Sequence, residues 1–130
     1  MAHSLVDRGA RRVYAAARHP EEITDNNVTP IALDITSAGQ VADATRTCPD
    51  VILLINNAVE ARQSPLIGAS SLEPARAQME TNYFGTLAMC RAFAPVLATN
   101  GGGALVNMRS IVSFFNVPSM GSLCATKAAL

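Results

Sequence analysis

The sequence of 130 residues lacks an excess of charge of either sign, because ten basic and ten acidic residues cancel at pH 7. It contains no basic run, which argues against nucleic-acid binding, and no apolar segment long enough to span a bilayer. Its first residues lack the apolar core of a signal peptide. With 49% hydrophobic residues, these features predict one apolar globular domain in the cytoplasm, without a membrane or nucleic-acid partner.

Cysteine and histidine are also scarce. Cys48, Cys90 and Cys124 are widely spaced and odd in number, so we interpret them as reduced thiols rather than as a disulfide framework. His3 and His19 lie far from any pair of cysteines. The sequence therefore predicts no metal site.

Apolar runs typical of strands alternate with helical patterns along the chain. Strands are predicted at residues 12–17, 28–33, 51–55 and 104–108, and helices at 2–8, from 36 or 37 to 47, at 71–99 with Ser71 as cap, and from about 121. We expect Gly9 to end the first helix in a left-handed conformation, Pro30 to mark a sheet edge, and Pro95 to kink or end its helix early. The run 51–55 is typical of a central parallel strand. This alternation predicts an α/β fold with a doubly wound parallel sheet.

The last thirty residues, 101–130, carry the most informative pattern. Ser110 follows the apolar run 104–108, and the carboxyl end of a strand is where open α/β sheets place their chemistry. Leu123 follows thirteen residues later, and Lys127 four residues after that. On a helix, residues i and i+4 lie one above the other. Leu123 and Lys127 should therefore share a face directed at the strand that carries Ser110.

This layout resembles the short-chain dehydrogenase/reductase family, and the resemblance extends over essentially all 130 residues. In that family a serine, a tyrosine thirteen residues later and a lysine four further on transfer a proton beside a nicotinamide. The resemblance implies that Ser110 positions a substrate carbonyl and that Lys127 holds the nicotinamide ribose. It places Leu123 where the family has its tyrosine. Since leucine can neither donate nor accept a proton, we expect this form to be inactive.

The resemblance also implies a cofactor, NADP or NAD, at the ends of the first two strands. Arg18 takes the place where an arginine accommodates the 2′-phosphate of NADP, although a solvated turn would also suit it. Asp34 takes the place of an acid that meets the adenine, with the N–H of Ile35 beside it. A helix-capping aspartate ahead of Thr36 is an equally good interpretation of Asp34.

Two asparagine motifs complete the resemblance. Asn56, Asn57 and Ala58 resemble the turn Asn-Asn-Ala-Gly that passes the cofactor ribose, with Val59 in place of the glycine. Asn82 resembles an asparagine that kinks its helix and holds a water in the proton relay to the lysine, and a chance polar residue is the alternative.

Other parts of the family pattern have no counterpart in this sequence. There is no glycine-rich turn after a first strand, and no substrate loop or further strands follow Lys127. Against the family's strand order 3-2-1-4-5, the resemblance implies a partial Rossmann-like doubly wound parallel sheet that lacks its first, central strand and its C-terminal strands. We expect a single partial NAD(P)-binding domain over residues 1–130. The sequence leaves open whether its two halves close directly or another chain supplies a strand.

Two functional hypotheses follow. The first is an NADP-leaning oxidoreductase of small carbonyl or alcohol substrates, with weak or absent cofactor binding and no activity in this form. The second is a non-catalytic fragment or interaction module of such a protein, which forms homo-oligomers through the helix 71–99. A flavodoxin-like binding domain would need a phosphate loop after its first strand, and Arg18, His19 and Pro20 do not supply one.

Overall fold

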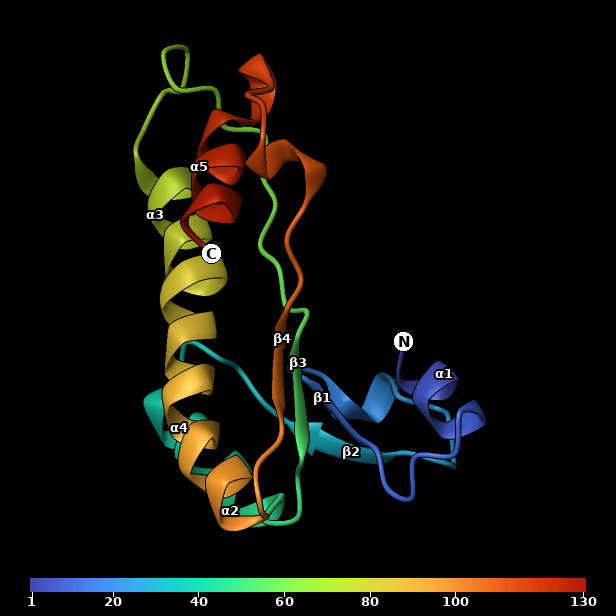
Figure 1. Cartoon of the computed structure of the whole chain (residues 1–130). Helices are drawn as coiled ribbons and strands as arrows, with labels where there is room; N and C mark the ends of the chain where they lie inside the picture. Colours follow the sequence, from blue (N-terminus) through green and yellow to red (C-terminus); the bar gives the residue numbers. More distant parts are fainter.

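The computed structural model describes all 130 residues, and its strands form two separate parallel pairs (Figure 1). β1 (Tyr14–Ala17) pairs with β2 (Thr29–Ala32), and β3 (Leu53–Asn56) pairs with β4 (Ala104–Asn107). The parallel α/β arrangement predicted from the sequence is confirmed. No ladder joins β1 to β3, so within these residues the two halves do not close onto each other.

Helices connect the strands and pack mainly along β3 and β4. They are α1 (Ala2–Asp7), α2 (Ala38–Thr47), α3 (Glu73–Met79), α4 (Thr86–Thr99) and α5 (Gly121–Ala129), with 3-10 turns η1 (Pro20–Glu22), η3 (Ile111–Ser113) and η4 (Pro118–Met120). In Figure 1, α3 and α4 follow one another in a long column beside β3 and β4, whereas α1 lies near β1 and β2. α2 contacts α4, and α5 contacts α3.

One hydrophobic cluster holds the two strand pairs together. Its buried members come from the second strand and from α2 and α4: Ile31, Leu33, Val41, Ala44, Cys48, Met89 and Phe93. Tyr14 of β1 and Leu54 of β3 pack against this cluster. Because full burial of one large apolar side chain contributes about 1.5–3 kcal/mol, the cluster is the main source of stability shared by both pairs.

The long helix differs from the prediction of one capped helix over residues 71–99. It begins at Glu73 without a side-chain cap, so Ser71 does not cap it, and Pro74 occupies its first turn, a position where proline is preorganised for a helix. Pro95 does not end the helix early, because α4 continues to Thr99. The hydroxyl of Thr99 donates to the carbonyl of Pro95 at 3.0 Å.

The irregular part of this helix is the π-helical segment η2 (Glu80–Gly85), which joins α3 to α4. It approaches the chain after β2 so closely that a Cβ on Gly85 would lie 2.8 Å from Cγ1 of Ile35. Only glycine permits that approach without movement of its neighbour. Asn82 lies within this segment, and π-helical turns occur frequently at functional sites.

Two local predictions are confirmed by backbone geometry. Gly9 has a φ of +87° and its N–H donates to the carbonyl of Val6, as expected for a left-handed residue that ends α1. The N–H of Thr29 donates to the carbonyl of Val13, the residue before β1. Alternate residues of a strand face opposite neighbours, so the nitrogen of Pro30, which carries no hydrogen, faces the outer edge of the pair.

The strand predicted as central is less buried than its composition suggests. Ile52 is 61% exposed and Leu53 is 41% exposed, although the apolar run is typical of a strand covered on both faces. The reason is that β3 has β4 on one edge and no strand on the other. β3 thus has the apolar composition of a central strand of a sheet, but one of its edges has no neighbouring strand.

Candidate active site and nucleotide-binding residues

A cavity of about 250 Å³ lies where β4 ends and α5 begins. Seven residues line it: Asn57, Val59, Met108, Arg109, Ser110, Leu123 and Lys127. The structure therefore brings Ser110, Leu123 and Lys127 around one space, in the arrangement expected from their spacing. Three segments converge here: the loop after β4 supplies Ser110, one face of α5 supplies Leu123 and Lys127, and the chain after β3 supplies Asn57 and Val59.

Lys127 is buried and firmly positioned. Its Nζ donates to the carbonyl of Met108 at 2.8 Å, while its own carbonyl accepts from Oγ of Ser113 at 2.9 Å and Nε of Arg109 at 3.3 Å. No carboxylate lies within ion-pair distance of its ammonium group. Burial therefore lowers the pKa of Lys127 below its ordinary value of 10.5.

Ser110 and Leu123 complete the wall of this cavity with different chemistry. Oγ of Ser110 accepts only a long bond, 3.4 Å, from the N–H of Val112 at the start of η3, so its hydroxyl hydrogen is free to donate. Leu123 is 7% exposed and presents an aliphatic side chain. Cys124 and Tyr83 do not line the cavity. The cavity thus has a hydroxyl and an ammonium but no phenol.

Asn82 connects η2 to α5 and to the chain after β3. Its side chain is fully buried. Oδ1 accepts from the N–H of Glu60 at 2.8 Å, and Nδ2 donates to the carbonyl of Glu60 at 2.9 Å and to Oγ1 of Thr126 at 3.0 Å. A second link joins the hydroxyls of Ser64 and Ser122 at 3.1 Å. These contacts fix the start of α5, and with it Lys127.

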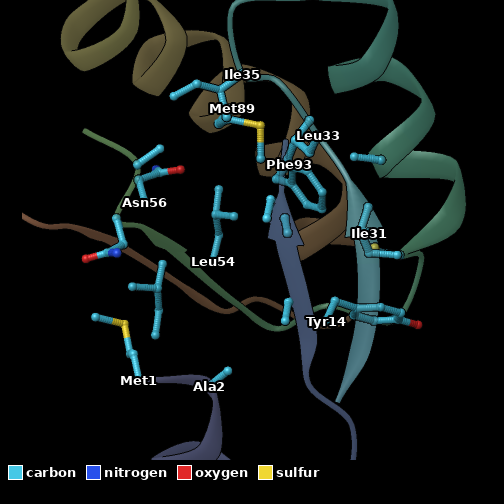
Figure 2. Close-up of a pocket in the computed structure, with 18 of the residues that line it drawn as sticks. Met1, Ala2, Tyr14, Ile31, Leu33, Ile35, Leu54, Asn56, Met89 and Phe93 are labelled. Carbon is cyan, nitrogen blue, oxygen red and sulfur yellow. The ribbon is translucent and has the colours of Figure 1, made fainter. Parts of the chain in front are cut away.

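A larger cavity of about 970 Å³ lies between β1 and β3 (Figure 2). Its wall is mostly apolar, and Figure 2 shows Met1, Leu33, Leu54, Met89 and Phe93 around it. The residues predicted to bind the cofactor all line it except Lys127: Arg18, Asp34, Ile35, Asn56 and Ala58. Because Asn57 and Val59 line both cavities, the two spaces adjoin beyond the end of β3.

Arg18 and Asp34 lie close together at the ends of β1 and β2. Oδ1 of Asp34 accepts from the hydroxyl of Thr36 at 2.7 Å and from its N–H at 2.9 Å. The hydroxyl, then the N–H, and more weakly the charge of Arg18 lower the pKa of Asp34. The helix cap is Ser37, which accepts from the N–H of Gln40. Asp34 therefore forms a turn ahead of α2, and the capping interpretation of this residue is wrong.

Asn56 lines the larger cavity, but its side-chain amide is engaged by neighbouring residues. Its Nδ2 donates to Oδ1 of Asn107 at 2.8 Å and to Sγ of Cys90 at 3.4 Å, and its carbonyl accepts from Met108 of the loop after β4. Asn57, which follows it, is exposed and makes no hydrogen bond within the chain. The sequence indicated Asn57 only as part of the turn that resembles Asn-Asn-Ala-Gly, and in the structure it lines both cavities.

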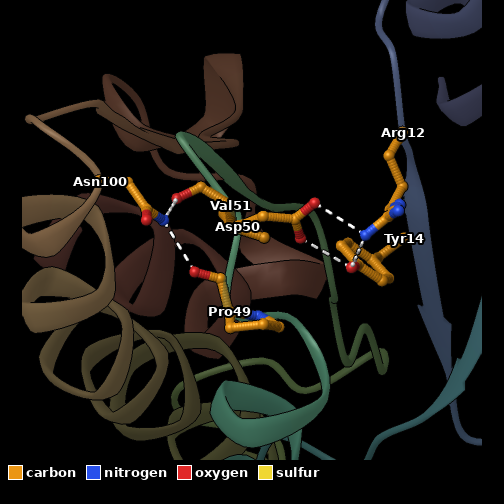
Figure 3. Close-up of polar contacts among 6 residues, drawn as sticks. All are labelled: Arg12, Tyr14, Pro49, Asp50, Val51 and Asn100. Atoms are coloured by element: carbon orange, nitrogen blue, oxygen red, sulfur yellow. Dashed lines mark hydrogen bonds and ion pairs between the residues drawn. The ribbon is translucent and has the colours of Figure 1, made fainter.

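A polar cluster at the amino ends of the strands joins the two halves (Figure 3). Nη1 of Arg12 donates to Asp50 at 2.9 Å, and the hydroxyl of Tyr14 donates to the same carboxylate at 2.7 Å. The bond from Tyr14 is the main cause that lowers the pKa of Asp50. Nδ2 of Asn100 donates to the two carbonyls on either side of Asp50, each at 2.9 Å. No pattern in the sequence indicated this cluster.

These residues fit the two ends of a dinucleotide better than its middle. Arg18 makes no ion pair within the chain, and the N–H of Ile35 makes no hydrogen bond, so both are free to bind an adenosine end. Lys127 and Asn57 border the smaller cavity at the opposite end. No glycine-rich turn of this chain lies between them to cradle a pyrophosphate.

Comparisons with known proteins agree with this architecture. The family model for short chain dehydrogenase matches residues 1–130. The chain is 28% identical over 131 aligned residues to human dehydrogenase/reductase SDR family member 7, covering 93% of this chain and 38% of that protein. It is 27% identical over 130 residues to the NADP-dependent 3-hydroxy acid dehydrogenase of Schizosaccharomyces pombe, covering 97% and 50%.

Solved structures show the same similarity. A short chain dehydrogenase from Burkholderia cenocepacia J2315 in complex with NADP is 50% identical and superposes with a TM-score of 0.92, over 98% of this chain and 54% of that one. A short-chain dehydrogenase from Streptomyces avermitilis is 26% identical with a TM-score of 0.87, over 99% and 51%. The chain thus spans about half the length of these proteins, and none of its helices could cross a membrane. The match over its whole length, with its parallel strand pairs, shows that it belongs to the short-chain dehydrogenase/reductase family.

Proposed function

We propose that residues 1–130 form one partial NAD(P)-binding Rossmann-like domain of an oxidoreductase that acts on small carbonyl or alcohol compounds. The observation that carries this proposal is the arrangement of Ser110, Leu123 and Lys127 around one cavity. The single core shared by both strand pairs supports the assignment of one domain. Bound NADPH would supply a hydride to a carbonyl, or bound NADP⁺ would accept one from an alcohol, and the residues of this chain would bind and orient the two reactants.

The preference for NADP over NAD rests on Arg18. This arginine lies at the end of β1, is exposed, and makes no ion pair, so its guanidinium is available for a ribose 2′-phosphate. The names of the fission-yeast relative and the Burkholderia structure mention NADP for those two proteins. In this chain Arg18, Ile35, Ala58 and Lys127 would hold the nucleotide, whereas the side chain of Asn56 is already engaged.

We propose further that this form does not transfer hydride at an ordinary enzymatic rate. Lys127 and Ser110 are available to orient a nucleotide and a carbonyl, but Leu123 fills the position from which a proton would come. General acid catalysis contributes roughly 10²–10⁴-fold to a rate. Asn82 would act through α5 as a positioning residue, and a water held near it stays a prediction.

Binding of the nucleotides tests the assignment of Arg18. NADPH and NADH are titrated separately into the purified chain, and binding is followed by saturation-transfer NMR, which detects millimolar affinities. We expect NADPH to bind more tightly than NADH, and Arg18→Ala to remove the difference. Arg76→Ala on α3 is a matched control, since Arg76 lines neither cavity. Equal affinity for both nucleotides, or no binding of either at 5 mM, would contradict the proposal.

A rate measurement tests the absence of hydride transfer. NADPH oxidation is followed at 340 nm with a panel of aldehydes and ketones, for the wild-type chain and for Leu123→Tyr. We expect no turnover with either protein, because the substituted phenol would still lack a tightly held cofactor. Turnover by the wild-type chain at about 1 s⁻¹ or faster, within the usual range for enzymes, would overturn the proposal.

The second candidate, a non-catalytic interaction module, is favoured by exposed apolar side chains. Ile111 is 71% exposed and Phe114 is 81% exposed, both in the segment that begins at η3. On the outer face of α4, Ala94 and Ala98 are also exposed, and we propose this face as a homo-oligomer interface. Light scattering after size-exclusion chromatography should show a dimer that Ala94→Arg on α4 disrupts, while Ala42→Arg on the exposed face of α2 leaves it intact. A monomer at 100 µM would contradict this candidate.

A further inference from the structure

Lys127 carries the only side-chain amine among the 130 residues, because nine of the ten lysine and arginine residues are arginine. A guanidinium stays protonated in proteins, whereas a lysine amine that loses its proton is a nucleophile. Lysines usually lie on the surface, but Lys127 is only 6% exposed and lines the cavity of about 250 Å³ at the end of β4. The chain therefore places its single side-chain amine on the wall of a small cavity.

The surroundings of this amine suit its neutral form. An ammonium group has three N–H donors, but Nζ has one acceptor within the chain, the carbonyl of Met108 at 2.8 Å. A neutral amine keeps that bond with one N–H and leaves its lone pair free. The other charged residue that lines the cavity is Arg109, which is also positive, and no carboxylate lines it. Together with the burial that lowers the pKa of Lys127, this arrangement favours an amine that can react.

Ser110 places a hydrogen-bond donor in the same cavity. Its Oγ accepts from the N–H of Val112 at 3.4 Å, and its hydroxyl hydrogen is free to donate. A ligand that contacts both Lys127 and Ser110 therefore needs an electrophilic atom for the amine and an oxygen that accepts a hydrogen bond. A carbonyl group provides both, on two adjacent atoms.

The rest of the wall limits this carbonyl compound to a short and apolar one. Val59 and Leu123 are apolar residues of the wall, against which an alkyl chain can pack. The volume of about 250 Å³ lies below the range of roughly 300–1,000 Å³ that is usual for ligand sites, so the ligand has few heavy atoms. Among small carbonyl compounds, aldehydes form imines more readily than ketones, because their carbonyl carbon carries only one carbon substituent.

We propose that Lys127 captures short aliphatic aldehydes in this cavity as an imine. Nζ of the neutral amine attacks the carbonyl carbon, and the π electron pair moves to the oxygen, which accepts a hydrogen bond from Ser110. The two hydrogens of the amine leave with that oxygen as water, and a C=N bond forms. No oxidant or reductant takes part. The reaction belongs to the chain without a bound nucleotide, so it goes beyond the proposed hydride transfer and is tested without a cofactor.

Reductive trapping tests this capture directly. The full chain is incubated at pH 7.5 with 1 mM propanal and sodium cyanoborohydride, which reduces an imine to a stable secondary amine. Peptide mass spectrometry then measures the rate of labelling at Lys127 and at the α-amino group of the chain. The same reaction in 6 M guanidinium chloride gives the rates for the unfolded chain. We expect Lys127 to be labelled at least roughly tenfold faster in the folded chain, because the cavity holds the aldehyde beside a neutral amine.

Matched serine variants test the part played by the hydroxyl. Ser110→Ala removes the donor in the cavity, whereas Ser119→Ala removes an exposed hydroxyl of η4 that lines neither cavity. We expect Ser110→Ala to slow the labelling of Lys127 roughly two- to tenfold, the effect of one hydrogen bond, and Ser119→Ala to leave it unchanged. The α-amino group should react at the same rate in both variants and serves as an internal reference. Circular dichroism checks that both variants fold, and the comparison of folded and unfolded wild-type chain needs neither of them.

Two results would overturn the proposal. The first is labelling of Lys127 that is no faster in the folded chain than in guanidinium chloride, which would mean that burial only shields the amine. The second is fast labelling that Ser110→Ala leaves unchanged, or that the bulky 1-naphthaldehyde gives at the same rate as propanal, which would mean that the amine reacts outside the cavity. The nucleotide titrations do not bear on either result, so failure of this inference and failure of the proposed function are distinguishable.

Discussion

Replacing Asn82 by alanine should strongly destabilise this chain, because the side chain is fully buried and makes three hydrogen bonds. Thr126 would keep one bond, since its hydroxyl also donates to the carbonyl of Leu123. The N–H and C=O of Glu60 would both lose their partner. At about 1–3 kcal/mol for each unsatisfied buried group, the two together predict a loss of about 2–6 kcal/mol. The lower half of this range is expected, because Glu60 is only partly buried and water can reach it.

Asn100→Ala is the matched control for this substitution. Asn100 also donates to two main-chain carbonyls, each at 2.9 Å, but it is exposed, so water can replace its side chain at both acceptors. We expect a loss below about 1 kcal/mol. Both variants are compared with the wild-type chain by urea unfolding, monitored by circular dichroism at 222 nm.

The comparison has a clear outcome that would refute this reasoning. If Asn82→Ala and Asn100→Ala lower the free energy of unfolding equally, the buried amide does not hold η2, Glu60 and α5 together. A loss of the size predicted for Asn82 would be a large part of the roughly 5–15 kcal/mol that stabilises a whole domain. Failure of Asn82→Ala to fold, beside a folded Asn100→Ala, would agree with the prediction.

Three further predictions use the same unfolding measurement or simple chemistry. Gly103→Ala should destabilise the folded chain by about 1–3 kcal/mol, because the new Cβ would lie 2.3 Å from the carbonyl oxygen of Ile52, just before β3. Gly39→Ala is the contrast: its Cβ would meet open space in α2, so it should stabilise the folded chain by about 0.5–1 kcal/mol. The pKa of Lys127 is lower in the folded chain than in the unfolded chain, so the charged lysine opposes folding at pH values below the folded pKa. The free energy of unfolding of the wild-type chain, measured relative to that of Lys127→Met, should therefore rise as the pH increases from the folded pKa toward 10.5, and fall again as the pH decreases. Cys48, whose pKa burial raises to about 11, should react with iodoacetamide at pH 8 more slowly than the less buried Cys90, as mass spectrometry would show.

The parallel fold could be predicted because local signals and tertiary structure agree in this chain. Apolar runs became strands, and Gly9 and Pro30 lie where their backbone preferences place them. Helix details were less predictable, because they depend on contacts distant in sequence. Ser71 does not cap its helix, and Pro95 does not end the helix early. The distortion lies instead in η2, where Gly85 meets Ile35 across fifty residues of chain.

The candidate site was predictable in position and less so in detail. Fixed spacing on α5 and the end of β4 sufficed to bring Ser110, Leu123 and Lys127 together, since helix and strand geometry determine those directions. The inward turn of Asn56 toward Asn107 could not be predicted, because it depends on the pairing of two strands that lie fifty residues apart. Long-range pairing also decides the polar cluster around Asp50, which carries no local motif.

The buried ammonium of Lys127 indicates that this cavity has a function even though it contains no proton donor at position 123. Its ammonium is buried, has a single carbonyl acceptor and no carboxylate, and therefore opposes folding at neutral pH. A methionine in its place would pack without that cost. Groups that reduce stability while being held by several surrounding contacts are characteristic of functional sites. Since Leu123 leaves no phenol for the ammonium to influence, we propose that a remaining function of Lys127 is the binding of a ribose, which the nucleotide titrations test.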